Sequence, residues 1–98
     1  MPIAVYFHPA SMSVAQYRDI MERLDDAGVG TPPGRLHHSA FGPADHLMVY
    51  DVWDSKESFD TFTQTLMPIL KKVGIDPGTP DVMPIHGLLQ MLRSAPAE

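Results

Sequence analysis

Two stretches of helical periodicity, each flanked by short apolar runs, decide which folds this chain can adopt. Apolar residues recur at intervals of three and four over residues 14–27 and again over residues 59–73. The runs before, between and after them are rich in β-branched and aromatic residues, which is typical of strands. We predict strands at residues 3–8, 35–41, 47–53 and 82–90. The expected order is strand, helix, strand, strand, helix, strand.

The boundaries of the two helices are marked by their sequences. Ser13 with Gln16, and Asp54 with Glu57, have the spacing of capping boxes, so each pair predicts a helix start. Glycines that can adopt positive φ are expected to end the helices. These glycines are Gly28, Gly30 and Gly74.

Two prolines modify this prediction. Pro68 lies inside the second helical stretch, where it removes a backbone donor and crowds the preceding turn. We expect a kink there, or a helix that ends near Met67. Pro84 lies in the last apolar run, and proline cannot donate to a central ladder, so this strand is expected at an edge of the sheet.

This order predicts an α+β fold of the ferredoxin-like βαββαβ type, with an antiparallel four-stranded sheet and two helices on one face. We expect a single domain at residues 1–92 and a frayed tail at residues 93–98. A chain of 98 residues buries little surface, and without cysteine it cannot add disulfides. The second sheet face is also largely apolar, so we expect a homodimer in which a second copy covers it.

Composition and charge exclude some partners. Asp and Glu (12) outnumber Lys and Arg (7), which gives a formal charge of −5 and argues against nucleic acid as a partner. No apolar run approaches the roughly 20 residues that span a bilayer, so no membrane insertion is expected. The first residues show no basic region and no cleavage site, so we expect a cytoplasmic protein.

The predicted hairpin brings several polar side chains together. If it is symmetric about Ala44, His37 lies opposite Asp51 and Arg35 opposite Trp53, and directly opposed residues share a sheet face. His37 and Asp51 then form either a general base oriented by a carboxylate or a structural ion pair. A slip of one residue would regroup every pair.

His86 is the first choice for a pocket residue, because an imidazole in an apolar run needs a hydrogen-bond partner. Trp53 stands at a strand end, where it either stacks on a flat ligand or fills the space between strand and helix. Tyr17 is interpreted first as a core residue whose hydroxyl could reach a cavity. The residues expected to contact a ligand are Tyr6, His8, Arg35, His38, Tyr50 and Trp53. The histidine spacing matches no compact metal motif, and no cofactor signature is present, so neither a metal nor a cofactor is expected.

Residues 52–62 (Val-Trp-Asp-Ser-Lys-Glu-Ser-Phe-Asp-Thr-Phe) resemble the antibiotic-biosynthesis-monooxygenase-like (ABM) family of dimeric α/β barrels. The resemblance implies a homodimer whose sheets close a barrel, with a ligand cavity between sheet and helices in each subunit. Some members are cofactor-independent monooxygenases of polycyclic phenols, and others degrade haem. Trp53 matches the strand-end Trp of both groups.

Other family residues have no match. The monooxygenases use an Asn on the same strand, where Val49 stands, and this chain contains no Asn. The haem degraders use an Asn on the first strand and a His on the second helix, both missing here. Phenol oxidation would therefore need Tyr50, His86 or the pair of His37 and Asp51 as its base.

Two functions follow. The first is a cofactor-independent monooxygenase or related enzyme that acts on a hydrophobic, aromatic or polyketide-like molecule, with His86, His37 and Asp51 as catalytic residues. The second is a non-catalytic module that binds a small molecule, haem included, or serves in assembly. Either small-molecule function predicts a cavity of roughly 300 Å³ or more.

Overall fold

The computed structural model describes residues 1–88 and shows the six expected elements in the expected order. They are β1 (Ile3–Phe7), α1 (Val14–Asp26), β2 (Arg35–Phe41), β3 (Met48–Trp53), α2 (Lys56–Val73) and β4 (Asp81–Pro84). The predicted tail at residues 93–98 and the end of the proposed domain lie outside the described residues.

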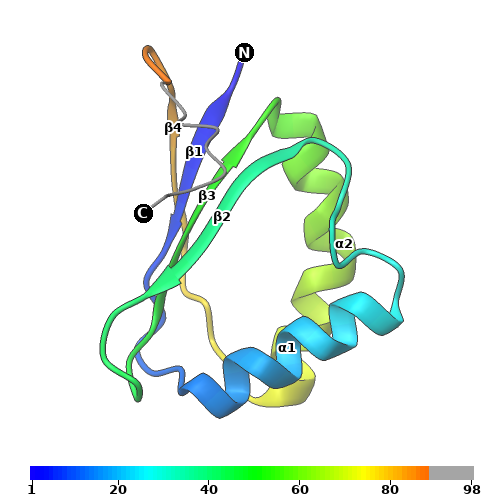
Figure 1. The fold of residues 1–98 in the computed structure, drawn as a ribbon, viewed down its shortest axis with the longest axis vertical. Helices are drawn as coiled ribbons and strands as arrows, with labels where there is room; N and C mark the ends of the chain where they lie inside the picture. Colours follow the sequence, from blue (N-terminus) through cyan, green and yellow to red (C-terminus); the bar gives the residue numbers. More distant parts are fainter. Residues whose placement is uncertain (89–98) are drawn as a thin grey trace, which may run out of the picture.

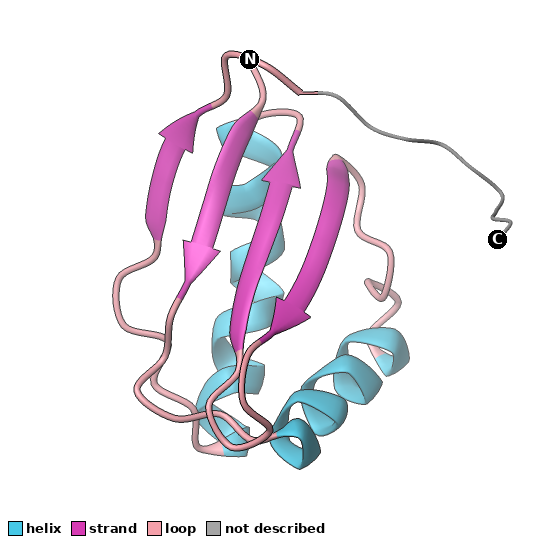
Figure 2. Cartoon of the chain, turned by 60° about the vertical axis from the view of Figure 1, so that its left-hand side comes forward, coloured by secondary structure: helices cyan, strands magenta, loops and turns pink. Residues whose placement is uncertain are grey.

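The four strands form one antiparallel sheet in the order β2-β3-β1-β4. Both helices lie on the same face of this sheet (Figures 1 and 2), so the predicted ferredoxin-like α+β arrangement is confirmed. β4 is an edge strand, as Pro84 predicts, but it ends at that residue instead of continuing. Residues 85–88 form no strand, and the last two residues of the predicted strand, 89 and 90, lie outside the described part.

The hydrophobic core fills the space between the sheet and the two helices. β1 shows strict alternation, with Ile3, Val5 and Phe7 buried, because successive side chains of a strand point to opposite faces. Trp53 is completely buried, and its ring centroid lies 5.1 Å from that of Phe62. Of its two interpretations, filling the space between strand and helix is therefore confirmed.

The start of α1 agrees with its predicted capping box, whereas the start of α2 lies one residue later than predicted. Ser13 Oγ accepts from the Gln16 backbone N–H, and the Gln16 side chain accepts from the Ser13 N–H. The cap of α2 is Ser55, whose side chain accepts from the Ser58 N–H at 3.1 Å. The prediction of Asp54 was wrong, because its own N–H donates to the Gly34 carbonyl and holds it at the end of the hairpin.

Pro68 does not end α2, which continues to Val73. The predicted end near Met67 is wrong. Gly74 ends the helix at a φ of 88°, and Gly28 follows α1 at a φ of 81°. Gly30 has no positive φ; instead, a Cβ there would lie 2.7 Å from an oxygen of Asp25, so close packing explains the glycine.

The hairpin of β2 and β3 contains an irregularity that matters for the site. Arg35 pairs with Trp53 as predicted, but from His37 onward the register shifts by one residue, so that His38 pairs with Asp51. Leu36 is the extra residue, as in a β-bulge, where two residues on one strand oppose one on the other. The predicted pairing of His37 with Asp51 is wrong for this reason.

The second face of the sheet carries no helix among the residues described (Figure 2). Tyr6 lies on this face, where its ring stacks on Phe41 at 6.3 Å and its hydroxyl donates to the sulfur of Met48. Phe41 and Met83 remain 44% and 55% exposed. We call this surface the open face. None of the helices within residues 1–88 has the length and apolar character needed to cross a bilayer.

Candidate functional site

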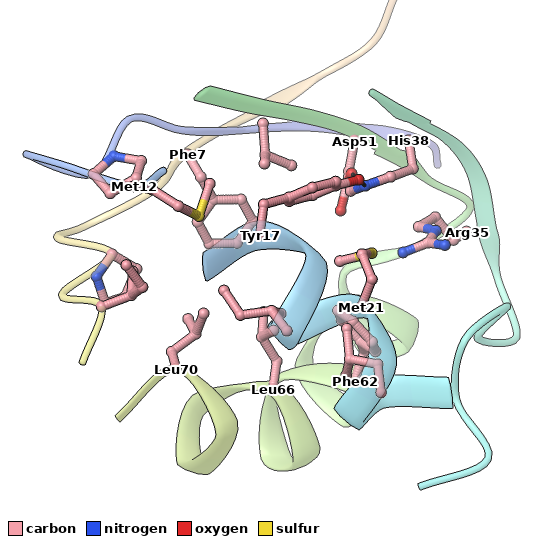
Figure 3. Close-up of a pocket in the computed structure, with 16 residues that line it drawn as sticks. Phe7, Met12, Tyr17, Met21, Arg35, His38, Asp51, Phe62, Leu66 and Leu70 are labelled. Carbon is pink, nitrogen blue, oxygen red and sulfur yellow. Dashed lines mark hydrogen bonds and ion pairs between the residues drawn. The ribbon is translucent and has the colours of Figure 1, made fainter. Parts of the chain in front are cut away.

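A chain of hydrogen bonds links the sheet to α1 in the middle of the molecule. His38 Nδ1 lies 2.6 Å from Asp51 Oδ1, and His38 Nε2 lies 2.7 Å from the Tyr17 hydroxyl. The bulge in β2 places His38 opposite Asp51, and the helical register of α1 points Tyr17 at the sheet (Figure 3). Three side chains from three different elements therefore form one connected network.

Asp51 is the fixed end of this network. It is the one buried charged residue of the described part of the chain, with 2% of its surface exposed. Trp53 Nε1–H donates to its second carboxylate oxygen at 3.3 Å. Burial of a carboxylate is costly unless its oxygens are hydrogen-bonded, and here both have donors. The pair of residues on β3 therefore forms a rigid support for the imidazole.

The contacts also define the tautomer of His38. A carboxylate offers only acceptors, so Nδ1 carries the proton in the contact with Asp51. Nε2 is then free to accept a proton, and the Tyr17 hydroxyl donates to it. An imidazole held in this way presents a basic nitrogen on the side away from the carboxylate, which is the geometry of a general base.

Tyr17 keeps its phenolic proton at neutral pH. Partial burial raises its pKa above the ordinary value of 10.0, and the negative charge of Asp51 raises it further. The guanidinium of Arg35 acts in the opposite direction and lowers the pKa. Burial is the largest of these effects, so the hydroxyl remains a donor to His38.

Arg35 stands beside this network on the first residue of β2. Its guanidinium lies 6.0 Å from the ring centroid of Phe62, within the range of a cation–π contact. One Nη2–H donates to the carbonyl oxygen of Gly30 at 3.1 Å. Figure 3 shows Arg35 at the same end of the pocket as His38 and Asp51.

These residues border a cavity of about 50 Å³ between the sheet and the helices. Tyr17, Arg35, His38 and Asp51 are its polar or charged lining residues, and the rest of the wall is apolar. The volume is well below the roughly 300 Å³ typical of sites for drug-sized ligands. Within residues 1–88, this cavity is therefore smaller than the ligand cavity that the sequence predicts. Met12 and Met21 are among the flexible side chains that occupy the space.

Four predicted site residues thus come together: Arg35, His38, Asp51 and Trp53. Five others do not. His37, Tyr50 and Tyr6 lie on the open face, with the ring centroids of His37 and Tyr50 5.8 Å apart. His8 is exposed and contacts Asp81 at 3.2 Å. His86 is exposed beyond the end of β4, away from the cavity.

Tyr17 also belongs to this network, although its sequence position indicates first a core residue. Its place in the helical repeat with Ile20 and Leu24 correctly indicates that it faces the sheet. A hydroxyl on an otherwise apolar helix face was the available signal, because a buried phenol requires a polar partner. Identifying that partner as His38 depended on the register of the hairpin.

Metal ligands do not gather in the described part of the chain. Within residues 1–88 no three or more His, Asp or Glu side chains are arranged so that they could hold a metal ion.

Solved structures with the same fold include oxygenases. SnoaB, a cofactor-independent oxygenase from Streptomyces nogalater, is 12% identical, with a TM-score of 0.60 over 92% of this chain and 96% of that chain. A monooxygenase from the gene ActVA-Orf6 of Streptomyces coelicolor, solved in complex with Nanaomycin D, is 18% identical, with a TM-score of 0.53 over 92% of each chain. The structural-genomics protein YJCS is 12% identical, with a TM-score of 0.60 over 88% of this chain and 100% of that chain.

These similarities confirm the predicted ABM-like resemblance at the level of the fold. No protein-family model and no curated protein matches the sequence.

Proposed function

We propose that this protein is a cofactor-independent monooxygenase that acts on a small aromatic phenol or enol, with His38 as its general base. The observation that carries the proposal is the network of Tyr17, His38 and Asp51 at the end of an apolar cavity. The fold shared with cofactor-independent oxygenases supports the same reaction class.

Each residue of the network has a separate role in this reaction. Nε2 of His38 removes the phenolic proton of the substrate, and Asp51 stabilises the imidazolium through Nδ1–H. Trp53 holds the carboxylate in place through its Nε1–H. The substrate hydroxyl takes the place of the Tyr17 hydroxyl, which donates to the nitrogen that acts as the base. The apolar wall keeps water from the anion.

The reaction balances with dioxygen as the oxidant. For a phenol such as 1-naphthol, deprotonation raises the electron density at the ring carbon opposite the oxygen, and that carbon forms a bond to O2. Cleavage of the O–O bond leaves one oxygen on the ring as a quinone carbonyl. The second oxygen leaves as water with the two hydrogens lost by the phenol.

Ligand entry requires a local rearrangement, since about 50 Å³ of free space does not hold a fused ring. Met12 and Met21 line the cavity and have three rotatable bonds each, so they are the side chains we expect to move. Haem is far larger still, and this volume favours a compact aromatic ligand over the alternative of haem binding.

We also propose that the active protein is a homodimer that pairs through the open face. Phe41 and Met83 remain 44% and 55% exposed there, beside Tyr6. Residues 1–88 supply no element that covers this apolar surface. A second sheet would bury it, and association of this kind is a common source of stability in small domains.

Oxygen consumption with 1-naphthol tests the proposed activity. We expect the wild-type protein to form 1,4-naphthoquinone with one O2 consumed per product. His38→Gln and Asp51→Asn should each lower the rate by about 10²–10⁴-fold, because a positioned base contributes that much. His46→Gln is the matched control, since it removes an exposed imidazole in the loop between β2 and β3, outside the cavity lining, and its rate should stay within about twofold of the wild type. Equal rates of oxygen consumption in the His38→Gln variant and the wild-type protein would refute the proposal.

A further inference from the structure

A second hollow, of about 200 Å³, lies along the loop before β2 and the first half of that strand. Its lining residues are Thr31, Pro32, Arg35, Leu36, His37 and His38. We call it the β2 groove. The β2 groove is more open to solvent than the inner cavity, and its lining combines polar residues with Pro32 and Leu36.

The β2 groove and the inner cavity share two walls. Arg35 and His38 line both spaces, so a molecule in the groove and one in the cavity would meet at these two side chains. A molecule in the groove would therefore contact the same two side chains that border the inner cavity.

The charge of the β2 groove is opposite to that of the whole protein. Its positive charge is that of Arg35, and its lining contains no Asp or Glu, although the chain has a formal charge of −5. Asp51, which lines the adjoining cavity, already accepts hydrogen bonds from His38 and Trp53. The positive charge of Arg35 in the β2 groove favours an anionic ligand.

Arg35 retains most of its hydrogen-bonding capacity. A guanidinium has five N–H donors, and within residues 1–88 only the contact of Nη2 with the Gly30 carbonyl uses one. No described carboxylate forms an ion pair with it. The packing on Phe62 and the bond to Gly30 hold the group in place, so its planar fork is oriented before a ligand arrives.

We infer that the substrate carries a carboxylate in addition to its phenol or enol. The carboxylate binds Arg35 at the junction of the two spaces, while the hydroxyl reaches His38. Bidentate pairing of a guanidinium with a carboxylate supplies both affinity and orientation. This inference rests on the proposed function, since it specifies the substrate class of the same site.

The experiment compares 4-hydroxybenzoate with 4-hydroxybenzamide by isothermal titration calorimetry at pH 7. The two molecules have the same shape and the same phenol, and differ in the charge of one group. We expect the wild-type protein to bind the acid at least tenfold more tightly than the amide. Added salt should weaken binding of the acid and leave that of the amide unchanged, because screening acts on the charge pair.

Substitutions locate the effect. Arg35→Met should remove the preference. We expect it to weaken binding of the acid at least tenfold and to change binding of the amide less than twofold. Arg35→Lys keeps the positive charge without the planar guanidinium, so it should retain part of the preference for the acid. This variant also tests the inference if Arg35→Met does not fold. Arg18→Met removes an exposed arginine on α1 and is the matched control, expected to behave like the wild type.

The outcomes separate this inference from the proposed function. Equal affinities for acid and amide in the wild type, or a preference that survives in Arg35→Met, would overturn the inference. Oxidation of 1-naphthol, which has no carboxylate, is independent of that result and decides the proposed function alone. A preference for the acid that depends on Arg35 supports the substrate class.

Discussion

At the scale of single residues, Tyr17 illustrates how burial sets a protonation state. Its hydroxyl is held between α1 and the sheet, where it donates to His38 at 2.7 Å. Burial and the charge of Asp51 raise its pKa, and Arg35 offsets part of that rise. The phenol of Tyr17 therefore stays neutral at neutral pH.

The raised pKa of Tyr17 predicts a loss of stability in alkali. Below pH 10 the residue is protonated in both the folded and the unfolded chain, so its contribution is constant. Above the unfolded value of 10.0, the unfolded chain releases the proton while the folded protein retains it. The free energy of unfolding therefore falls as the pH rises toward the higher folded pKa.

Urea unfolding at a series of pH values between 8 and 11 measures this effect. Tyr17→Phe has no phenolic proton to release, so its stability should decline less steeply above pH 10 than that of the wild type. Identical slopes in the two proteins would show that the environment of Tyr17 does not perturb its ionisation.

Individual side chains were identified from the sequence more reliably than their partners. Arg35, His38, Asp51 and Trp53 were all candidates, and the structure brings them together. The partner of Asp51 was predicted wrongly, because the structure pairs it with His38 and not with His37. No local pattern distinguishes two adjacent histidines on a strand, since their faces depend on the register of the partner strand.

At the scale of elements, the cap of α2 gives a clear test. Ser55 accepts from the Ser58 N–H, whereas Asp54 is exposed and its backbone N–H belongs to the hairpin. Ser55→Ala should lower the free energy of unfolding by about 1 kcal/mol, because one helix N–H loses its acceptor. Asp54→Ala is the control, and we expect a change within about 0.5 kcal/mol. Thermal unfolding compares the two, and the reverse ranking would place the cap at Asp54.

The order and type of the elements could be predicted because each depends on local periodicity and turn residues. The departures occur where distant parts of the chain compete. The predicted helix end near Met67 is wrong, because α2 continues past Pro68 to Val73. Its buried residues Phe59, Phe62, Leu66 and Leu70 pack on the sheet along the full length of the helix. Tertiary packing of this kind outweighs the loss of one backbone hydrogen bond.

At the scale of the whole molecule, the proposed dimer depends on the open face. Phe41→Asp would place a charge in the proposed interface, so we expect this variant to sediment as a monomer at low micromolar concentration, where we expect the wild type to be a dimer. Met67→Asp is the matched control, because Met67 is also an exposed apolar side chain but lies on α2. It should leave the dimer intact. A monomeric wild type under the same conditions would contradict the proposal.

The extra residue at Leu36 has a consequence beyond the geometry of one hairpin. Side chains three positions apart on a regular strand point in opposite directions, yet Arg35 and His38 border the same cavity because an insertion lies between them. An Arg-x-x-His segment followed, after a short connection, by Asp-x-Trp is therefore a searchable signature for other chains with this fold. Deleting Leu36 would remove the bulge and leave the two side chains two positions apart, an interval at which a regular strand still places both on one face.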